Sequence, residues 1–407
     1  MMNEYPLLDK KVGMEFYVTN IFPDKYFREN IKIKLKENDF YIKEEINMEL
    51  LKKVYRESYL KADWIILKLV LPYGISTMDL IRYFYLNHIH QKNFLFIGLK
   101  DKYALSIQYL LINRKYEKKI LKLLERKDIK IETIGYIDRS LVTKNMLEKN
   151  LFIVKVYNPP PIDFVKELLC KYNPNFFPNY FGYQRFGKNF LNHIIGEYML
   201  LEGDINSHIE RYEEKAIFDI LSSYGVDRTI TLENILRKIP KYMIKFYINS
   251  FQSYIFNRLI SKRIGYNYPL DKCIKGDYYL DYFNDLNKFI IKIATLHINP
   301  LNKPWAPLIG YGYIPKITRL SDRLYMEILP KLGAILEKFK KLYKMGLLIR
   351  SNFRPITLNV NSLSLVTYNN FNDEWITLNF KLGRGMYATI LLREIFKPLR
   401  PNTQGFA

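Results

Sequence analysis

The sequence predicts a fold of mixed helices and strands, in which a mostly helical middle interrupts a sheet-rich domain. Apolar and polar residues alternate in several short runs up to residue 157 and again near the carboxyl end, a period typical of half-buried strands. Between Leu191 and Arg263 the apolar residues recur at helical spacing instead. The 407 residues are enough for two or three domains. The simplest arrangement is one α/β domain with a helical domain inserted in it.

Local signals place the elements of the amino half in order. Residues 31–36 alternate Ile or Leu with Lys, so we expect a strand with one basic face, which continues in extended form over 39–44. Ser76, with Asp79 three residues later, resembles a capping box and predicts a helix that runs to about Leu86. Strands are expected at 64–71, 93–97, 105–112 and 150–157, and a surface helix at 115–130. The three prolines at 159–161 mark the start of another helix, which ends near 172.

The second half is predicted in the same way. Helices dominate 191–263, with a cap at Asp204 and a stop at Gly225, and 264–330 is a mixed segment. A basic amphipathic helix covers 331–345. Strands return at 356–360 and 375–382, and a compact helix closes the chain at 387–396.

Charge and aromatic content point to a polyanionic partner. Lys plus Arg is 63 and Asp plus Glu is 41, so the formal net charge is +22, more than solubility requires. The aromatic share is 15%, with 34 Tyr and 26 Phe. A basic and aromatic chain favours RNA, whose unstacked bases need flat partners as well as phosphate contacts. The alternative is a proteome biased toward Ile, Lys, Asn and Tyr.

Other classes of protein are disfavoured. Two cysteines without a CxxC pair predict neither a disulfide framework nor a structural zinc site. The amino terminus lacks the apolar core of a signal peptide, and the longest apolar run, 64–71, is too short to cross a bilayer. We therefore expect a cytoplasmic protein with no membrane contact and no metal.

The first candidate for chemistry is Asp101, which follows a short buried strand and lies between Lys100 and Lys102. Neighbouring cations keep a carboxylate ionised even in a partly dry cleft, where it acts as a nucleophile or a base. The alternative is an ordinary surface turn of Lys and Asp.

Asn150 and Phe152 lie two residues apart on a predicted strand and so share one face. An amide beside an aromatic ring suits a flat base, because one group hydrogen-bonds and the other stacks. The alternative is a strand end with a buried Phe.

Two glycine-containing strings are further candidates. The string 179–187 reads Asn-Tyr-Phe-Gly-Tyr-Gln-Arg-Phe-Gly, and it is either a loop that brings Arg185 to phosphate or an irregular connection. The glycines of 383–389 precede a helix, where exposed N–H groups either bind an anion or only cap the helix.

These segments, in this order, resemble an archaeal-like member of the TruD family of tRNA pseudouridine synthases. Residues 98–108 resemble the family string G-x-K-D-[RK]-x-A-x-T-x-Q, with Ser106 in place of Thr. Residues 179–187 resemble N-Y-F-G-x-Q-R-F-G, 251–257 resemble Q-S-x-x-F-N, and 385–394 resemble G-x-Y-A-T-x-x-L-R-E. The motifs run through nearly the whole chain. Two departures are Lys149, where the family usually has Gly, and Leu382-Gly383, where Leu-Pro is common.

The resemblance implies a cofactor-free isomerisation of uridine to pseudouridine in tRNA, with uridine 13 as the expected position and no obligate protein partner. Asp101 matches the essential aspartate. By similarity Phe152 stacks on the target base, Asn150 supports Asp101 or the base, and Lys34 supplies a countercharge. The residues expected to support the cleft are Lys100, Gln108, Gln184, Arg185, Phe186, Tyr387 and Arg393.

The resemblance also implies an α+β pseudouridine synthase fold, with a mixed, mostly antiparallel sheet flanked by helices. We expect a catalytic domain made of 1–187 and 350–407, with a mainly helical insertion domain at 188–349. Two rival functions remain, the first resting on charge and aromatic content alone. One is an RNA-binding protein or RNA chaperone without chemistry, and the other is a metal-dependent nuclease that uses Asp101 with Asp39 and Glu44.

Overall fold

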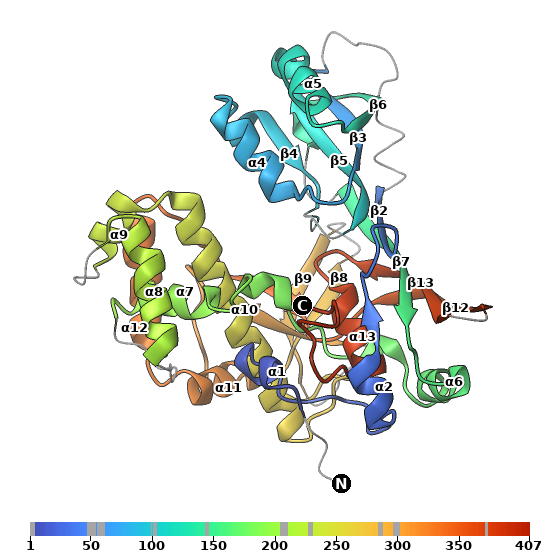
Figure 1. The fold of residues 1–407 in the computed structure, drawn as a ribbon. Helices are drawn as coiled ribbons and strands as arrows, with labels where there is room; N and C mark the ends of the chain where they lie inside the picture. Colours follow the sequence, from blue (N-terminus) through green and yellow to red (C-terminus); the bar gives the residue numbers. More distant parts are fainter. Residues whose placement is uncertain are drawn as a thin grey trace.

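A computed structural model of the chain describes residues 5–46, 54, 62–98, 100, 104–142, 146–203, 211–226, 231–283, 288–295, 302–370 and 373–407. Figure 1 shows a large twisted sheet with helices around it and a helical lobe beside it. The elements of the amino half are α1 (Leu7–Lys11), α2 (Lys25–Asn30), β1 (Lys32–Ile33), β2 (Phe40–Ile46), β3 (Trp64–Leu71), α4 (Thr77–Leu86), β4 (Phe94–Phe96), β5 (Leu105–Asn113), α5 (Glu117–Glu125), β6 (Lys130–Ile137), β7 (Leu147–Tyr157) and α6 (Ile162–Lys171).

The remaining elements form the lobe and the carboxyl end. The middle of the chain contributes a short 3₁₀ helix, η6 (Tyr183–Phe186), followed by α7 (Asn192–Leu200), α8 (Arg211–Ser223), α9 (Leu232–Lys238), α10 (Lys241–Gly265), β8 (Tyr278–Phe283), β9 (Lys288–Ile293), β10 (Pro304–Leu308), α11 (Leu320–Ile328) and α12 (Leu332–Lys344). The carboxyl end contributes β11 (Asn352–Pro355), β12 (Val360–Asn370), β13 (Asp373–Gly383) and α13 (Ala388–Phe396).

The large sheet has nine strands in the described part of the chain. Its order is β12-β13-β7-β2-β5-β3-β6, with β1 paired to β7 and β4 paired to β5. The β2–β5 pair is parallel, and the other pairs of this sheet are antiparallel. Strands from both ends of the chain therefore meet in one sheet, since β13 lies against β7. The prediction of an α+β fold with a mixed, mostly antiparallel sheet is confirmed.

Several expected elements are confirmed almost to the residue. Strand β3 and the end of α4 lie where the sequence predicts them, and Ser76 and Asp79 form a full capping box. Three expectations are wrong. The strand at 31–36 stops at Ile33, because Lys34 has a left-handed backbone (φ 58°) that breaks the alternation. The helix at 115–130 ends at Glu125, since strand β6 begins at Lys130. The strand expected at 356–360 begins only at Val360. The cap expected at Asp204 lies outside the described residues.

The sheet is buried on both faces at its β3–β5 end. One apolar cluster packs these strands against α4 and α5, through side chains such as Leu67, Phe84 and Leu124. A second cluster around Trp64 and Leu111 covers the other face. The largest cluster joins β7 and β13 to α13 and continues into the helical lobe. One continuous core therefore links the expected catalytic domain to the lobe.

The lobe is built on the long helix α10, which packs against α7. The closest approach is at Gly196, where a Cβ atom would lie 2.2 Å from the carbonyl oxygen of Tyr247, so no larger residue fits without moving a helix. A four-stranded sheet in the order β11-β10-β8-β9 completes it. The insertion domain is expected to end at residue 349, but β11 lies after that residue and pairs with β10, which lies before it. The small sheet therefore contains strands from both sides of this expected domain boundary, and the boundary itself stays a prediction. No described helix is long and apolar enough to cross a membrane.

Candidate functional site

The residues before Asp101 follow β4, and polar contacts tie them to β2, to β5 and to the start of α4. Asp101 itself lies outside the described residues. Gly98 and Lys100 are described, and each is held by several polar contacts. The site is therefore built outward from these two residues.

The backbone here is fastened by Thr77 and Gln108. The Lys100 N–H donates to Thr77 Oγ1 at 2.7 Å, and the Thr77 N–H donates to the Lys100 carbonyl at 3.1 Å. The Gln108 amide donates to the Gly98 carbonyl at 2.6 Å, and the Thr77 hydroxyl donates to Gln108 Oε1 at 3.0 Å. Thr77 and Gln108 are fully buried, and Thr77 is the first residue of the capped helix α4. Helix α4 and strand β5 thus fix the chain directly before Asp101, and the supporting role of Gln108 stays a prediction.

The Lys100 side chain turns inward. Its ammonium lies 3.0 Å from Glu44 Oε1 and donates to Asn150 Oδ1 at 2.6 Å, and the Lys100 and Glu44 side chains are 4% and 0% exposed. Burial raises the pKa of Glu44, opposed by the Lys100 charge and by the Tyr109 N–H, which donates to Glu44 Oε2 at 2.8 Å. Burial lowers the pKa of Lys100, opposed by Glu44. The surface-turn alternative fails for Lys100, because its ammonium lies in a buried ion pair.

Glu44, Asn150 and Phe152 share one face of the large sheet. The register pairs Glu44 with Asn150 across β2 and β7, and it pairs Phe152 with Phe380 of β13. Phe152 is 6% exposed, its ring stacks on Phe380 at 5.4 Å, and the Phe40 ring meets it edge-on at 6.2 Å. The two residues thus share a face, as their spacing predicts. Stacking of Phe152 on a base stays a prediction.

Lys34 reaches the same region from the end of β1. Its ammonium lies 4.9 Å from the centroid of the Phe40 ring, a cation–π contact. Phe40 in turn contacts Phe152. The left-handed backbone at Lys34, rather than a strand face, directs this side chain. Its role as a countercharge to Asp101 stays a prediction.

The string 179–187 forms a buried junction between the amino-terminal segment, the lobe and the carboxyl end. The Phe181 N–H donates to Asn257 Oδ1 at 2.7 Å, and the Arg185 side chain donates to Ser253 Oγ at 3.1 Å. Phe186 is fully buried against the edge of His193, and Gln184 is half-buried. The string therefore joins α10 to the rest of the molecule. The support of the cleft by Gln184, Arg185 and Phe186 stays a prediction.

Arg393 and Tyr387 make contacts inside the protein. Arg393 is fully buried and donates to Asp9 Oδ2 at 2.8 Å and to Glu394 Oε1 at 2.8 Å. The Tyr183 hydroxyl donates to the other Asp9 oxygen at 2.5 Å. Tyr387 is half-buried at the start of α13 and packs on Gly182, where a Cβ atom would lie 2.7 Å from the ring. Their support of the cleft stays a prediction.

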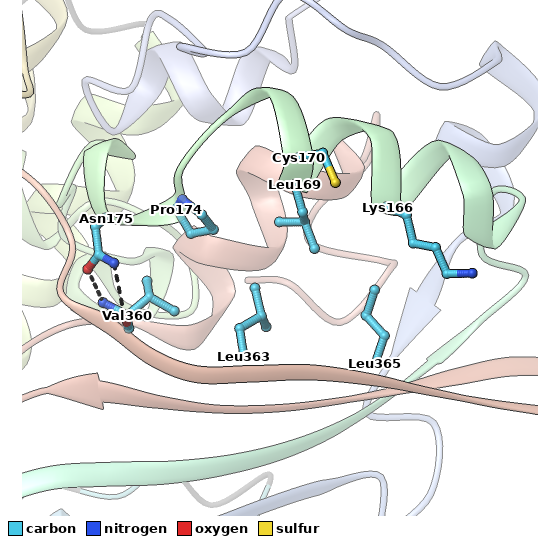
Figure 2. Close-up of a pocket in the computed structure, with 8 residues that line it drawn as sticks. All are labelled: Lys166, Leu169, Cys170, Pro174, Asn175, Val360, Leu363 and Leu365. Carbon is cyan, nitrogen blue, oxygen red and sulfur yellow. Dashed lines mark hydrogen bonds between the residues drawn. The ribbon is translucent and has the colours of Figure 1, made fainter.

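A separate groove of about 400 Å³ lies between α6 and β12. Figure 2 shows Leu169, Leu363 and Leu365 facing one another across it, with Cys170 on the helix, and Asn175 bonded to the backbone of Val360. It shares no residue with the site around Lys100. Within the described ranges, no three His, Cys, Asp or Glu side chains are grouped as metal ligands.

Sequence reasoning missed three residues that organise these regions. Glu44 entered only as a rival metal ligand, although an acid at an inward position of a half-buried strand signals a buried partner. Thr77 gave no signal beyond its place after a helix cap. Arg354, 4.0 Å from the centroid of the Phe181 ring, donates to Asn179 Oδ1 at 2.7 Å, and no local motif marks it.

The family profile described as tRNA pseudouridine synthase D (TruD) matches residues 11–217 and 211–395. The chain belongs to the TruD family. A probable tRNA pseudouridine synthase D from Pyrococcus furiosus is 27% identical over 90% of this chain and 95% of its own length. Another, from Archaeoglobus fulgidus, is 27% identical over 96% and 99%. The resemblance inferred from the TruD motifs is confirmed.

A crystal structure of a TruD protein from Methanosarcina mazei has the same fold. It superposes with a TM-score of 0.62 at 21% identity, over 97% of this chain and 99% of that one. The TruD likeness therefore includes both the large sheet and the helical lobe.

Proposed function

We propose that this protein converts uridine to pseudouridine in tRNA, at uridine 13, with Asp101 as the acting group. Membership of the TruD family and the names of its relatives support the reaction and the substrate class. The observation that carries the assignment within the molecule is the fastening of Gly98 and Lys100 by Thr77, Gln108 and Glu44. A loop held at so many points suits a group that must meet its target atom accurately.

The reaction needs no external redox partner or energy source. The bond between C1′ and N1 breaks, the uracil turns, and C1′ bonds to C5. The proton of C5 leaves, and N1 gains a proton, so atoms and charge balance. Asp101 serves this exchange by attack on C1′, by attack on the uracil ring, or by removing a proton from the ribose.

The remaining predicted residues surround this step. Lys34 supplies positive charge near the Phe40–Phe152 pair, and Asn150 offers an amide two residues from Phe152. The target base must leave its stack, at a cost of a few kcal/mol, and an aromatic face compensates part of that cost. The catalytic domain of 1–187 and 350–407 and the insertion domain of 188–349 then form the two walls of an RNA cleft.

The nuclease alternative is disfavoured by the places of its carboxylates. Asp39 accepts from the Tyr157 hydroxyl at 3.0 Å and from the Lys36 N–H at 2.7 Å. Glu44 is paired with Lys100 instead. Asp39 lies in the bend directly before β2, and Glu44 lies within that strand, so each carboxylate is already held by its own partners. Neither belongs to a group of three possible metal ligands among the described residues.

Release of tritium from C5-labelled uridine in a tRNA transcript tests the proposal. We expect release by the wild type and none by Asp101→Asn, with equal binding of the transcript by both proteins. Chemical mapping of pseudouridine in the product then gives its position. Binding without release by the wild type would favour the RNA chaperone, whereas cleavage of the transcript would favour the nuclease.

A further inference from the structure

The orientation of the Asn150 amide is fixed by its neighbour. Lys100 Nζ lies 2.6 Å from Asn150 Oδ1 and has hydrogen-bond donors but no acceptor. The oxygen of the amide must therefore face Lys100, and the nitrogen must point elsewhere.

Lys100 is in turn fixed by Glu44. The ammonium lies 3.0 Å from Glu44 Oε1, and the other Glu44 oxygen accepts from the Tyr109 N–H at 2.8 Å. Both side chains are almost fully buried, so the loss of either charge leaves the other without its partner in a dry site. Glu44 also has no space to turn, because Gly98 packs directly against it.

The result is a chain of three side chains, Glu44 to Lys100 to Asn150, which we name the amide relay. Its last member lies on the same sheet face as Phe152, the residue proposed to stack on the base. Because Oδ1 faces Lys100, the Nδ2 group points away from it, and on that far side Asn150 offers N–H donors. Such a donor matches a carbonyl oxygen and mismatches an amino group.

We propose that the amide relay selects uracil over cytosine, by holding Asn150 so that it presents only N–H donors to the base. Uracil carries the O4 carbonyl where cytosine carries the N4 amino group. The inference rests on the proposed function, and it assigns Glu44 and Lys100 as positioning residues that act through Asn150. With cytosine at the site, the N–H donors of Asn150 would face the N4 amino group, which is also a donor, so both buried groups would lack a hydrogen-bond partner.

Equilibrium binding of two tRNA transcripts tests the relay. They differ only at the uridine that the wild type converts, which is cytidine in the second transcript. Because the wild type converts this uridine before equilibrium is reached, binding is measured in an Asp101→Asn background, which sets the reference ratio. We expect this background to bind the uridine transcript about tenfold more tightly than the cytidine transcript. In Glu44→Gln and Lys100→Met the ratio should fall to about threefold or less, because the amide is then free to turn. Asn150→Asp, which has no N–H to offer, should abolish or invert the preference.

Matched controls separate the relay from general loss of charge. Glu45→Gln removes the next acid of β2, which pairs with Lys381 at 2.7 Å and is 31% exposed. Lys149→Met removes the lysine beside Asn150, which pairs with Glu148. Both variants should keep the reference ratio. A relay variant that fails to fold is replaced by Asn150→Asp, which keeps the volume of the side chain.

Two results would overturn the inference. One is equal binding of both transcripts by the Asp101→Asn protein while the wild type isomerises the uridine transcript, and this leaves the proposed function intact. The other is a full reference ratio in folded Glu44→Gln and Lys100→Met. A wild type that binds neither transcript would instead overturn the proposed function, and the proposed selection of uracil would be overturned with it.

Discussion

Replacing Gly98 with Ala should damage catalysis without removing RNA binding. A Cβ atom at this position would lie 2.2 Å from Glu44 Oε1 and 3.5 Å from Leu147 Cδ2. Contacts below 3.0 Å are essentially never found for a Cβ atom, so one of the two must move by about 1 Å. Glu44 is held by Lys100 and by the Tyr109 N–H, so the movement falls on the loop that leads to Asp101.

The size of the effect follows from that displacement. A misplacement of about 1 Å costs roughly 100-fold in rate, equivalent to about 2.7 kcal/mol in the barrier. We therefore expect the single-turnover rate of tritium release to fall about 100-fold in Gly98→Ala, while the Kd for the transcript changes less than about threefold. The disturbed contact, between Gly98 and Glu44, is buried, whereas most of the free energy of RNA binding is expected from phosphate contacts at the surface.

Gly333→Ala is the matched control, because no atom lies within 4 Å of its added Cβ atom. It should turn over at the wild-type rate. Circular dichroism and thermal melts confirm that both variants are folded. A folded Gly98→Ala protein with a wild-type rate would refute the argument that the Glu44–Gly98 contact positions the loop.

The other predictions concern stability and charge. Asp9→Ala should lower the free energy of unfolding by up to about 3–5 kcal/mol in urea titrations, because it removes one of the two buried carboxylates that pair with Arg393, whereas Asp9→Asn should cost less. Burial lowers the pKa of His193 to about 3 from an ordinary 6.5, so the unfolded chain binds a proton that the folded chain does not. The stability that depends on neutral His193 is fully present above about pH 6.5, and it is lost on acidification at about 1.4 kcal/mol per pH unit down to about pH 3. His193→Phe should remove this part of the pH dependence of the free energy of unfolding, as urea titrations at several pH values would show. Gly333→Ala in α12 should raise the free energy of unfolding by up to about 1 kcal/mol and so raise the melting temperature, and an unchanged melting temperature would contradict this. RNA affinity should fall steeply between 50 and 200 mM salt, by roughly a thousandfold for about six phosphate contacts, and a flat salt dependence would contradict phosphate binding.

Local sequence was sufficient where a signal and its consequence are neighbours in the chain. The capping box of Ser76 and Asp79 predicts the start of α4, and the continuous apolar run of 64–71 predicts the buried strand β3. The spacing of Asn150 and Phe152 places both on one face of β7, because alternation is a property of any strand. The order of the motifs was enough to identify the TruD family.

Tertiary structure decided the partners of the charged side chains. The sequence places Lys100 beside Asp101, but only the register of β2 against β7 brings Glu44 and Asn150 to its ammonium. A lysine on a surface turn and a lysine in a buried pair have the same local sequence. The difference comes from desolvation and from the one partner that offsets it, and that partner is 56 residues away in the chain.

The same holds for the junction of the string 179–187. Its glycines and aromatics fit equally a loop that brings Arg185 to phosphate and an irregular connection. In the structure Phe181 and Arg185 bond to residues of α10 about seventy positions later. The left-handed backbone of Lys34 likewise has no counterpart in its alternating sequence. Periodicity and capping act over a few residues and can be read from the chain. The contacts of buried polar groups depend on which distant segments the fold brings together.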